Sequence, residues 1–365
     1  MNTIPPDRNL RVGVIGTSSF AEICHIPGIQ SHPRAEVAAV WGRRISAARE
    51  MADKFGISKA TDDFEALCND PDIDAVSIAS ANVVHAEQAI TALRCGKHVF
   101  CEKPIAMNAA EARAMAEAAR ASGAVHQVAF TFRYNYGLRE LRRRIAAGDI
   151  GTPFLARIQY DRWDGLIADW KASWRDQKAS AGAGILFDLG SHLFDITHHV
   201  LGPISSVIGY THIVLREAPD KVTGEMIRVE TDDLVNAWMR LQSGLRAQFF
   251  VSRVTPPFAD LGYLEIVGEK GALKAALSRG GVDYLKASSP EAPEWMDLPL
   301  PAEASDGTPH ALGLMMHSFV DACLRGGVDE TLDATFEDGL AAQLAMSALM
   351  DSQETDRWVR LDEVG

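Results

Sequence analysis

The sequence predicts two domains: an α/β domain with a doubly wound parallel sheet over residues 1–133, and an α+β domain with an open, mostly antiparallel sheet and helices over residues 134–365. Two patterns predict this division. Up to about residue 130, short apolar runs alternate with amphipathic segments, as in repeated strand and helix units. After about residue 151, strand-like runs follow one another across short turns, which is typical of antiparallel pairing. The length of 365 residues also favours two domains.

The first domain opens with a run dense in valine and isoleucine, Leu10–Gly16, which has no polar alternation. Such a run is expected of a parallel strand that is covered on both faces. Glycines at 96 and 123 stop two of the helices that follow. We predict strands at residues 10–16, 36–41, 75–79, 98–101 and 126–130, and helices at residues 20–30, 46–55, 84–95 and 109–122.

The second domain has fewer helical patterns and more short strands. Gln242-Ser243-Gly244 reads as a hairpin turn between two of them. The segment 288–309 is rich in Pro, Glu and Ala and is expected to be a surface loop. We predict strands at residues 154–160, 207–214, 234–241, 245–253, 263–267, 272–277 and 282–285, and helices at residues 187–201, 310–325 and 336–353.

Composition narrows the classes of partner. The formal net charge of −13 and the lack of a Lys/Arg run argue against nucleic acid or an anionic membrane surface. The five cysteines are odd in number and form no CxxC pair, which fits reduced thiols in the cytoplasm. No segment approaches 18 uninterrupted apolar residues, and the polar start lacks the features of a signal peptide. We therefore expect a cytoplasmic protein with no membrane partner.

A glycine turn follows the first strand and opens the first helix, where exposed N–H groups and the helix dipole favour a pyrophosphate. Its sequence is Gly16-Thr17-Ser18-Ser19-Phe20-Ala21. Gly16 allows the tight turn and Ala21 allows close packing, but Ser18 stands where a second glycine usually lets the backbone touch phosphate. The alternative is a strand–helix turn that binds no ligand. The expected dinucleotide contacts here are Gly16, Ser18, Ser19, Phe20 and Ala21.

The second strand ends in Gly42, Arg43 and Arg44, where a carboxylate would hold the ribose hydroxyls of NAD. Guanidinium groups can instead pair with a 2′-phosphate and stack on adenine. This pattern favours NADP over NAD as the cofactor. The alternative is that both arginines are solvated residues at the start of the next helix.

Two distant stretches supply groups suited to moving a proton from an alcohol. Cys101-Glu102-Lys103-Pro104 ends a predicted strand, and Asp188-Leu189-Gly190-Ser191-His192 lies on a predicted helix. Asp188 and His192 are four residues apart and so share one helix face, where a carboxylate can orient an imidazole that acts as general base. Lys103 can hydrogen-bond the substrate hydroxyl and stabilise alkoxide character as hydride leaves the carbon.

Each of these residues also has a plainer interpretation. A single histidine on an amphipathic helix is more often structural than catalytic, and a lysine before proline can simply end a strand. Asp195, His198 and His199 extend the cluster and raise a metal alternative, in which Asp188 and His192 bind a divalent ion. No second ligand set with clear spacing accompanies them, so we expect no metal.

Read together, these features resemble the Gfo/Idh/MocA family of NAD(P)-dependent oxidoreductases along nearly the whole chain. The resemblance implies an N-terminal Rossmann domain, a C-terminal open sheet that forms a homodimer or homotetramer interface, and oxidation of a sugar, inositol or related polyol. It implies catalytic roles for Lys103, Asp188 and His192, and a cis bond before Pro104. Departures are Ser18 and, where proline is frequent, Ala81. The matching motifs are the glycine turn with His25-Ile26-Pro27, the segment Ile78-Ala79-Ser80 with Asn82 and His85, Gly96-Lys97-His98-Val99 before Glu102-Lys103-Pro104, Gly184 to Asp195, and residues 352–359. Positions matching the nicotinamide side are Ser80, Asn82, His85, Glu102 and Lys103.

Substrate contacts are expected from two further segments, together with Asp188 and His192. Aromatic faces can stack on the C–H surface of a sugar while arginine meets hydroxyls or a carboxylate. The same tryptophans could instead anchor a loop to the core. The candidates are Trp163, Trp170, Trp174, Arg162 and Arg175 in one segment, and Phe132, Arg133, Tyr134 and Asn135 in the other.

These observations predict a dehydrogenase or reductase in which His192 exchanges the hydroxyl proton, Asp188 orients it and Lys103 polarises the C–O bond. A second possibility is a glycosidase or epimerase that retains its nucleotide and oxidises its substrate transiently. A third is a non-catalytic NADP-binding regulatory protein, in which loss of the lysine or the histidine would be expected.

Overall fold

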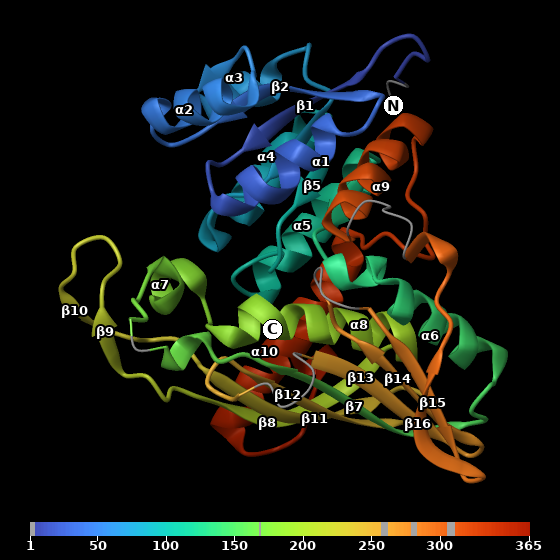
Figure 1. Cartoon of the computed structure of the whole chain (residues 1–365). Helices are drawn as coiled ribbons and strands as arrows, with labels where there is room; N and C mark the ends of the chain where they lie inside the picture. Colours follow the sequence, from blue (N-terminus) through green and yellow to red (C-terminus); the bar gives the residue numbers. More distant parts are fainter. Residues whose placement is uncertain (1–3, 168, 257–261, 279–282, 305–310) are drawn as a thin grey trace. The chain divides into compact units, whose positions relative to one another are not determined.

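The computed structural model describes residues 4–167, 169–256, 262–278, 283–304 and 311–365. The chain forms two compact units (Figure 1). The first unit is Met1–Phe130 with Pro309–Leu340, and the second is Thr131–Thr308 with Ala341–Gly365. The sequence was expected to divide between residues 133 and 134, with residues 309–340 in the second domain. In the structure, the segment 309–340 groups with the first unit.

The first unit is built on a sheet of six parallel strands in the order β3-β2-β1-β4-β5-β6. This order confirms the predicted doubly wound sheet of the Rossmann type. The strand order reverses between β1 and β4, and ligands of such sheets bind where it reverses, beyond the carboxyl ends of the strands. The strands are β1 (Leu10–Ile15), β2 (Ala35–Trp41), β3 (Ala60–Thr61), β4 (Ala75–Ile78), β5 (His98–Cys101) and β6 (His126–Val128).

Helices of the first unit pack on this sheet and on one another. The predicted helix at residues 20–30 is a π-helical turn, Ala21–His25, that continues into an α-helix. Strand β3 and helix α3 were not predicted, because both are very short. The helices are α1 (Ile26–Gln30), α2 (Ile45–Phe55), α3 (Phe64–Asn69), α4 (His85–Arg94), α5 (Ala109–Ser122) and α9 (Ala311–Arg325).

A sheet of nine strands, in the order β16-β15-β14-β13-β7-β12-β11-β8-β17, forms the second unit. All neighbouring strands are antiparallel except β7 and β12, so the expectation of a mostly antiparallel sheet is confirmed. The strands are β7 (Pro153–Asp161), β8 (Ile204–His212), β11 (Leu234–Leu241), β12 (Arg246–Ser252), β13 (Gly262–Gly268), β14 (Gly271–Ala276), β15 (Leu285–Ser289), β16 (Ala292–Leu298) and β17 (Val359–Arg360).

Further elements of the second unit lie outside this sheet. β9 (Glu217–Pro219) and β10 (Met226–Arg228) form a separate antiparallel pair. Phe194 stacks on Phe249 with 4.5 Å between ring centroids, which packs a helix onto strand β12. The helices are α6 (Tyr136–Ala147), α7 (Lys178–Ala181) and α8 (Ser191–Leu201), and α10 (Phe336–Thr355) begins in the first unit and continues in the second.

The hairpin at Gln242-Ser243-Gly244 is confirmed, because the N–H of Leu241 bonds to the carbonyl of Leu245 across it. The loop expected at 288–309 is wrong in its first part, where β15 ends and β16 runs as the edge strand. Its last residues, Val282 at the start of the strand expected at 282–285, and His310 lie outside the described residues. None of the described helices combines the length and apolar composition needed to cross a bilayer.

Candidate functional site

The glycine turn follows β1 with its geometry set by the end of β4. Gly16 has a φ of +118°, and a Cβ there would lie 2.5 Å from the carbonyl oxygen of Ala79, so only glycine fits. The hydroxyl of Ser18 donates to that same carbonyl over 2.8 Å and accepts from the N–H of Ala21 over 3.3 Å. Ser18 therefore stabilises the turn through both hydrogen bonds of its hydroxyl. Of the other predicted contacts, Ser19 is exposed, Phe20 is half-buried and Ala21 is buried.

At the end of β2, Gly42 is buried, whereas Arg43 and Arg44 are both exposed. Arg44 is the residue before α2 and has an extended backbone conformation. No carboxylate follows this strand directly, since residues 42–44 are Gly-Arg-Arg. The position that would meet the adenine ribose thus offers two cationic side chains.

His85 fixes the segment that follows β4 against the one that follows β5. Its Nδ1 lies 2.9 Å from the carbonyl of Pro104, and its Nε2 lies 3.3 Å from the carbonyl of Ser80. Burial lowers the pKa of His85, so the ring is neutral and donates to one carbonyl, and the shorter distance favours Pro104. Ser80 also donates its hydroxyl to Gln88 over 2.6 Å. Asn82 begins the short 3₁₀ turn Asn82–Val84 between these residues.

A buried chain of polar contacts connects Ser77 of β4 to Glu102, the residue that precedes Lys103. The ring of His25 contacts the hydroxyl of Ser77 through Nδ1 at 2.7 Å and the carboxylate of Glu102 through Nε2 at 3.0 Å. The other oxygen of Glu102 accepts from the backbone N–H of Lys103 over 3.2 Å. Burial opposes ionisation of Glu102, but its contacts with His25 and the charge of Lys103 lower its pKa overall. The peptide bond Lys103–Pro104 is cis, as predicted.

In the second unit, the predicted acid–base pair lies where a π-helical turn becomes an α-helix. Asp188 belongs to the turn Leu186–Gly190, and His192 belongs to α8. His192 is buried against the ring of Phe132, with 4.9 Å between centroids. Asp188 is partly exposed and forms an ion pair with Arg162 at 3.1 Å. Arg162, expected among the substrate contacts, is thus placed beside the carboxylate.

Arg133 and Asp195 form a buried ion pair in the same unit. The Nε of Arg133 lies 3.1 and 3.0 Å from the two oxygens of Asp195, and its Nη2 lies 2.5 Å from one of them. Both side chains are buried, as is the neighbouring Tyr134. The carboxylate raised as a possible metal ligand is therefore held by a guanidinium. In the part of the chain that the structure describes, no three His, Cys, Asp or Glu side chains are grouped to hold a metal ion.

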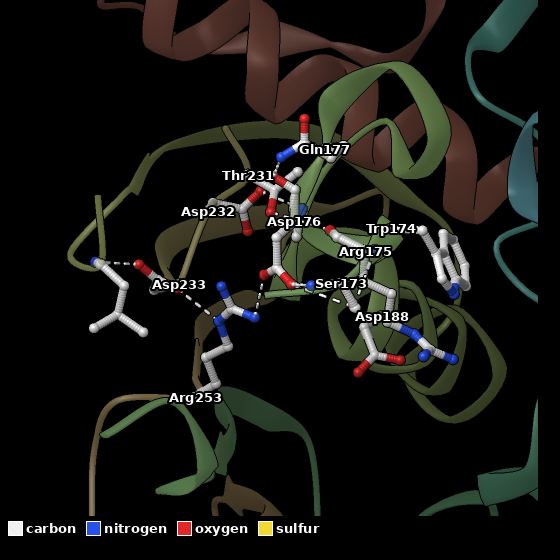
Figure 2. Close-up of polar contacts among 12 residues, drawn as sticks. Ser173, Trp174, Arg175, Asp176, Gln177, Asp188, Thr231, Asp232, Asp233 and Arg253 are labelled. Carbon is white, nitrogen blue, oxygen red and sulfur yellow. Dashed lines mark hydrogen bonds and ion pairs between the residues drawn. The ribbon is translucent and has the colours of Figure 1, made fainter. Parts of the chain in front are cut away.

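The three tryptophans of the segment before α8 differ in their surroundings. Trp170 packs on a small buried cluster of Ala172, Ala218 and Val229, so it anchors the segment. Trp163 and Trp174 are 45% and 40% exposed. The guanidinium of Arg175 lies 4.7 Å from the centre of the Trp174 ring. Figure 2 shows this pair together with a network of polar contacts that includes Asp176, Asp233 and Arg253.

Sequence reasoning missed several residues of these networks. His25 was noted as part of a motif, but no role was assigned to it, and Ser77 was not singled out. Asp176, Asp233 and Arg253 were also missed, although Thr231-Asp232-Asp233 directly before an apolar strand is an unusual concentration of polar residues. That concentration was the available signal.

Two family models match this chain. Residues 10–130 match the model described as "Oxidoreductase family, NAD-binding Rossmann fold". Residues 138–274 match the model described as "GFO/IDH/MocA C-terminal domain".

Similar proteins cover most of the chain. The levoglucosan dehydrogenase of Pseudarthrobacter phenanthrenivorans is 28% identical and aligns over 98% of this chain and 99% of its own. The 1,5-anhydro-D-fructose reductase of Ensifer adhaerens is 33% identical over 72% and 74% of the two chains. A solved structure of levoglucosan dehydrogenase in complex with NADH superimposes with a TM-score of 0.88 at 27% identity, over 97% of this chain and 99% of that one. The chain therefore belongs to the Gfo/Idh/MocA family of oxidoreductases.

Proposed function

We propose that this protein is an NAD(P)-dependent dehydrogenase or reductase that acts on a secondary hydroxyl or carbonyl of a sugar, inositol or related polyol. The observation that carries the proposal is the position of Lys103. It follows β5 at the same edge of the NAD-binding sheet as Gly16 and Ser80, on a backbone held by ionised Glu102. Named relatives support the substrate class, since they include a levoglucosan dehydrogenase and the myo-inositol 2-dehydrogenase of Thermotoga maritima.

The residues of the first unit fit a dinucleotide. The turn at Gly16 leaves no room for a Cβ and opens a helix, which suits a pyrophosphate close to the backbone. Ser18, Ser19, Phe20 and Ala21 would complete the cradle, and Ser80, Asn82, His85, Glu102 and Lys103 would line the nicotinamide side. A bound nicotinamide supplies the group that accepts or donates hydride.

The catalytic roles follow from the chemistry of three side chains. We assign to Lys103 the hydrogen bond to the substrate oxygen, which stabilises alkoxide character when the C–H bond breaks. His192 takes the hydroxyl proton during oxidation and returns it during reduction. Asp188, held by Arg162 over 3.1 Å, orients the substrate and the imidazole. Trp163, Trp174 and Arg175 would contact the sugar, while buried Arg133 and Tyr134 would shape the site from behind.

We further propose a preference for NADP. The support is the exposed pair Arg43 and Arg44 after Gly42, where an acidic residue would favour the free ribose of NAD. Replacing Arg43 by Asp should raise the KM for NADP at least tenfold and lower the KM for NAD. Equal KM values for the two cofactors in the unchanged protein would contradict this preference.

Oligomerisation through the second unit's sheet is also proposed, as a homodimer or homotetramer. Tyr210 on β8 and Trp238 on β11 are 50% and 41% exposed on neighbouring strands, which is unusual for large aromatic side chains. Trp238→Glu should lower the mass measured by light scattering to that of a smaller assembly. Met226→Glu, at an exposed position of β10 outside this sheet, should leave the mass unchanged. A monomeric unchanged protein would contradict the proposal. We also propose a cytoplasmic location, which the five free cysteines support.

The test of the main proposal is a direct assay. Purified protein is mixed with NADP or NAD and with a panel of sugars, inositols and sugar acids, and reduced nicotinamide is followed by absorbance. Lys103→Met should lower kcat at least a hundredfold while the dissociation constant for the cofactor stays within about threefold. Lys59→Met, at an exposed ion pair with Asp70, is the matched control and should keep full activity.

Full turnover by the Lys103→Met variant would contradict the assigned role. Product formation without net change in the cofactor would support the epimerase or glycosidase alternative. Cofactor binding without turnover of any substrate would support the regulatory alternative.

A further inference from the structure

Three consecutive buried residues of the second unit, Thr231-Asp232-Asp233, hold separate segments that lie far apart in the sequence (Figure 2). The hydroxyl of Thr231 donates to the backbone carbonyl of Arg175 over 3.1 Å. The two oxygens of Asp232 each accept a backbone N–H, from Gly184 and from Leu186, both over 2.8 Å. We call these three residues together with Arg253 the 231–253 cluster.

Asp233 links the rest of the cluster to the guanidinium of Arg253, whose side chain is 11% exposed. One of its oxygens accepts from Nε of Arg253 over 2.6 Å, and Nη1 of Arg253 lies 2.8 Å from the carboxylate of Asp176. The guanidinium also lies 5.0 Å from the centre of the Trp170 ring. Burial disfavours the charge on Arg253, but the two carboxylates outweigh this effect and raise its pKa. Arg253 is therefore a cation that bridges the carboxyl groups of two aspartates.

Asp176 connects Arg253 to the turn that carries the exposed Trp174. Its carboxylate accepts from the N–H of Ser173 over 2.8 Å, and the hydroxyl of Ser173 accepts from the N–H of Arg175 over 3.3 Å. These bonds close the short turn Trp174–Asp176, whose last carbonyl also accepts from the N–H of Glu230 over 2.9 Å. Trp174 and Arg175 project from a turn that is fixed on several sides.

Asp232 of the cluster holds the segment that leads into α8, the helix with His192. The carbonyl of Asp232 accepts from the N–H of Ile185 over 2.9 Å. A Cβ at Gly184 would lie 2.0 Å from that carbonyl oxygen, so the backbone of Gly184 packs directly against the backbone of Asp232. The turn containing Asp188 begins at Leu186, directly after these contacts, and continues into α8 with His192.

We infer that the 231–253 cluster positions the Trp174–Arg175 turn relative to the helix bearing Asp188 and His192, and that Arg253 thereby determines affinity for the sugar or polyol substrate. The inference rests on the proposed function, because it takes Trp174 and Arg175 to be substrate contacts. Arg253 is a positioning residue. It contacts Asp176, which closes the turn Trp174–Asp176, whereas the substrate would contact Trp174 and Arg175 of that turn. A planar guanidinium can bridge Asp176 and Asp233 through separate nitrogens, which a lysine ammonium cannot reproduce.

The test is Arg253→Lys, which keeps the charge and removes the bridge. We expect the KM for the substrate to rise at least tenfold while kcat stays within about threefold and the dissociation constant for NADPH or NADH is unchanged. Trp174→Ala should raise KM similarly. The double variant should be no worse than the more affected single variant, because both changes remove the same contact. Arg360→Lys, at an exposed ion pair with Asp362, is the matched control and should leave all three constants unchanged.

Two kinetic results would overturn the inference: unchanged KM in Arg253→Lys, or equal losses in KM, kcat and cofactor affinity, which would indicate general structural damage. If Arg253→Lys fails to fold, Thr231→Val removes only the bond to Arg175 and should give the same selective rise in KM.

Failure of the proposed function can be told apart from failure of this inference. If the unchanged protein oxidises no substrate of the panel, hydrogen exchange tests the cluster alone. In Arg253→Lys, the amides of residues 173–177 should then exchange at least tenfold faster while those of the sheet of the first unit stay unchanged. Unchanged exchange at residues 173–177 would overturn the inference whatever the activity.

Discussion

Replacing Gly16 by Ala should destabilise the first unit and weaken cofactor binding. The φ of +118° at this position is essentially restricted to glycine, and forcing an alanine into it costs about 1–3 kcal/mol. The new Cβ would also lie 2.5 Å from the carbonyl oxygen of Ala79. That carbonyl cannot move freely, because the N–H of Ala79 bonds to Ile15 over 2.8 Å and Ser18 donates to the same oxygen. Overpacking of this kind adds about 1–3 kcal/mol.

The expected loss in the free energy of unfolding is therefore about 2–6 kcal/mol. For a unit of this size each kcal/mol lowers the melting temperature by about 3 °C, so we expect a fall of about 6–18 °C. The assay is thermal unfolding followed by circular dichroism, with titration of NADPH or NADH by calorimetry. The dissociation constant should rise at least tenfold, because the turn that approaches the pyrophosphate is displaced.

Gly56→Ala provides the matched control for this prediction. Gly56 also has a positive φ, +66°, but a Cβ there would meet nothing within 4 Å. Only the left-handed backbone strain remains, about 1–2 kcal/mol, and cofactor affinity should not change. If Gly16→Ala melted no lower than Gly56→Ala, the close approach to Ala79 would have no energetic consequence and the reasoning would be refuted.

Three other predictions concern buried groups. Asp195→Asn should lower the free energy of unfolding by about 3–5 kcal/mol in urea titrations, because it removes the negative charge from the buried ion pair with Arg133. A loss below about 1 kcal/mol would contradict this prediction. With a thiol reagent at pH 8, half-buried Cys95 should react first, because burial raises the pKa of Cys68 to about 12, and Cys95→Ser should abolish the fast phase. Burial lowers the pKa of His98, whose Nδ1 accepts a backbone N–H over 3.0 Å. Near and below pH 6.5 the unfolded chain therefore binds more protons than the folded protein does. The free energy of unfolding should fall as the pH is lowered through this range. His98→Gln should reduce this slope, by at most about 1.4 kcal/mol per pH unit, and an unchanged slope would exclude His98 as its source.

The parallel sheet of the first unit could be predicted because its strands are local apolar runs. The run at 10–16 lies in the middle of the sheet, so both faces are buried and the pattern is strong. Helix α6 was missed although Leu138, Leu141 and Ile145 repeat at helical spacing, so the signal existed and was overlooked. The edge strand β16 is largely exposed, and exposed edges lack the alternation that identifies a strand.

Long-range pairing could not be predicted from local patterns. Strand β12 pairs with β11 through a short hairpin, which the sequence indicates, but its parallel partner β7 is about ninety residues earlier in the chain. The networks around Glu102 and Arg253 depend on such pairings. Lys103, Asp188 and His192 could be proposed from their motifs, whereas His25, Asp176 and Asp233 become meaningful only when their partners are known.

The return of residues 309–340 to the first unit bears on how the protein is made. Phe319 of α9 packs on Phe100 of β5 with 5.3 Å between ring centroids, and the N–H of Val128 on β6 bonds to the carbonyl of Ala334 over 2.8 Å. During synthesis the six parallel strands leave the ribosome early, yet the helix and the segment that cover them follow only after most of the chain has been translated. A nascent chain halted near residue 300 should therefore hold an incomplete nucleotide-binding unit with exposed apolar surface, which makes it a client for chaperones until translation is nearly finished.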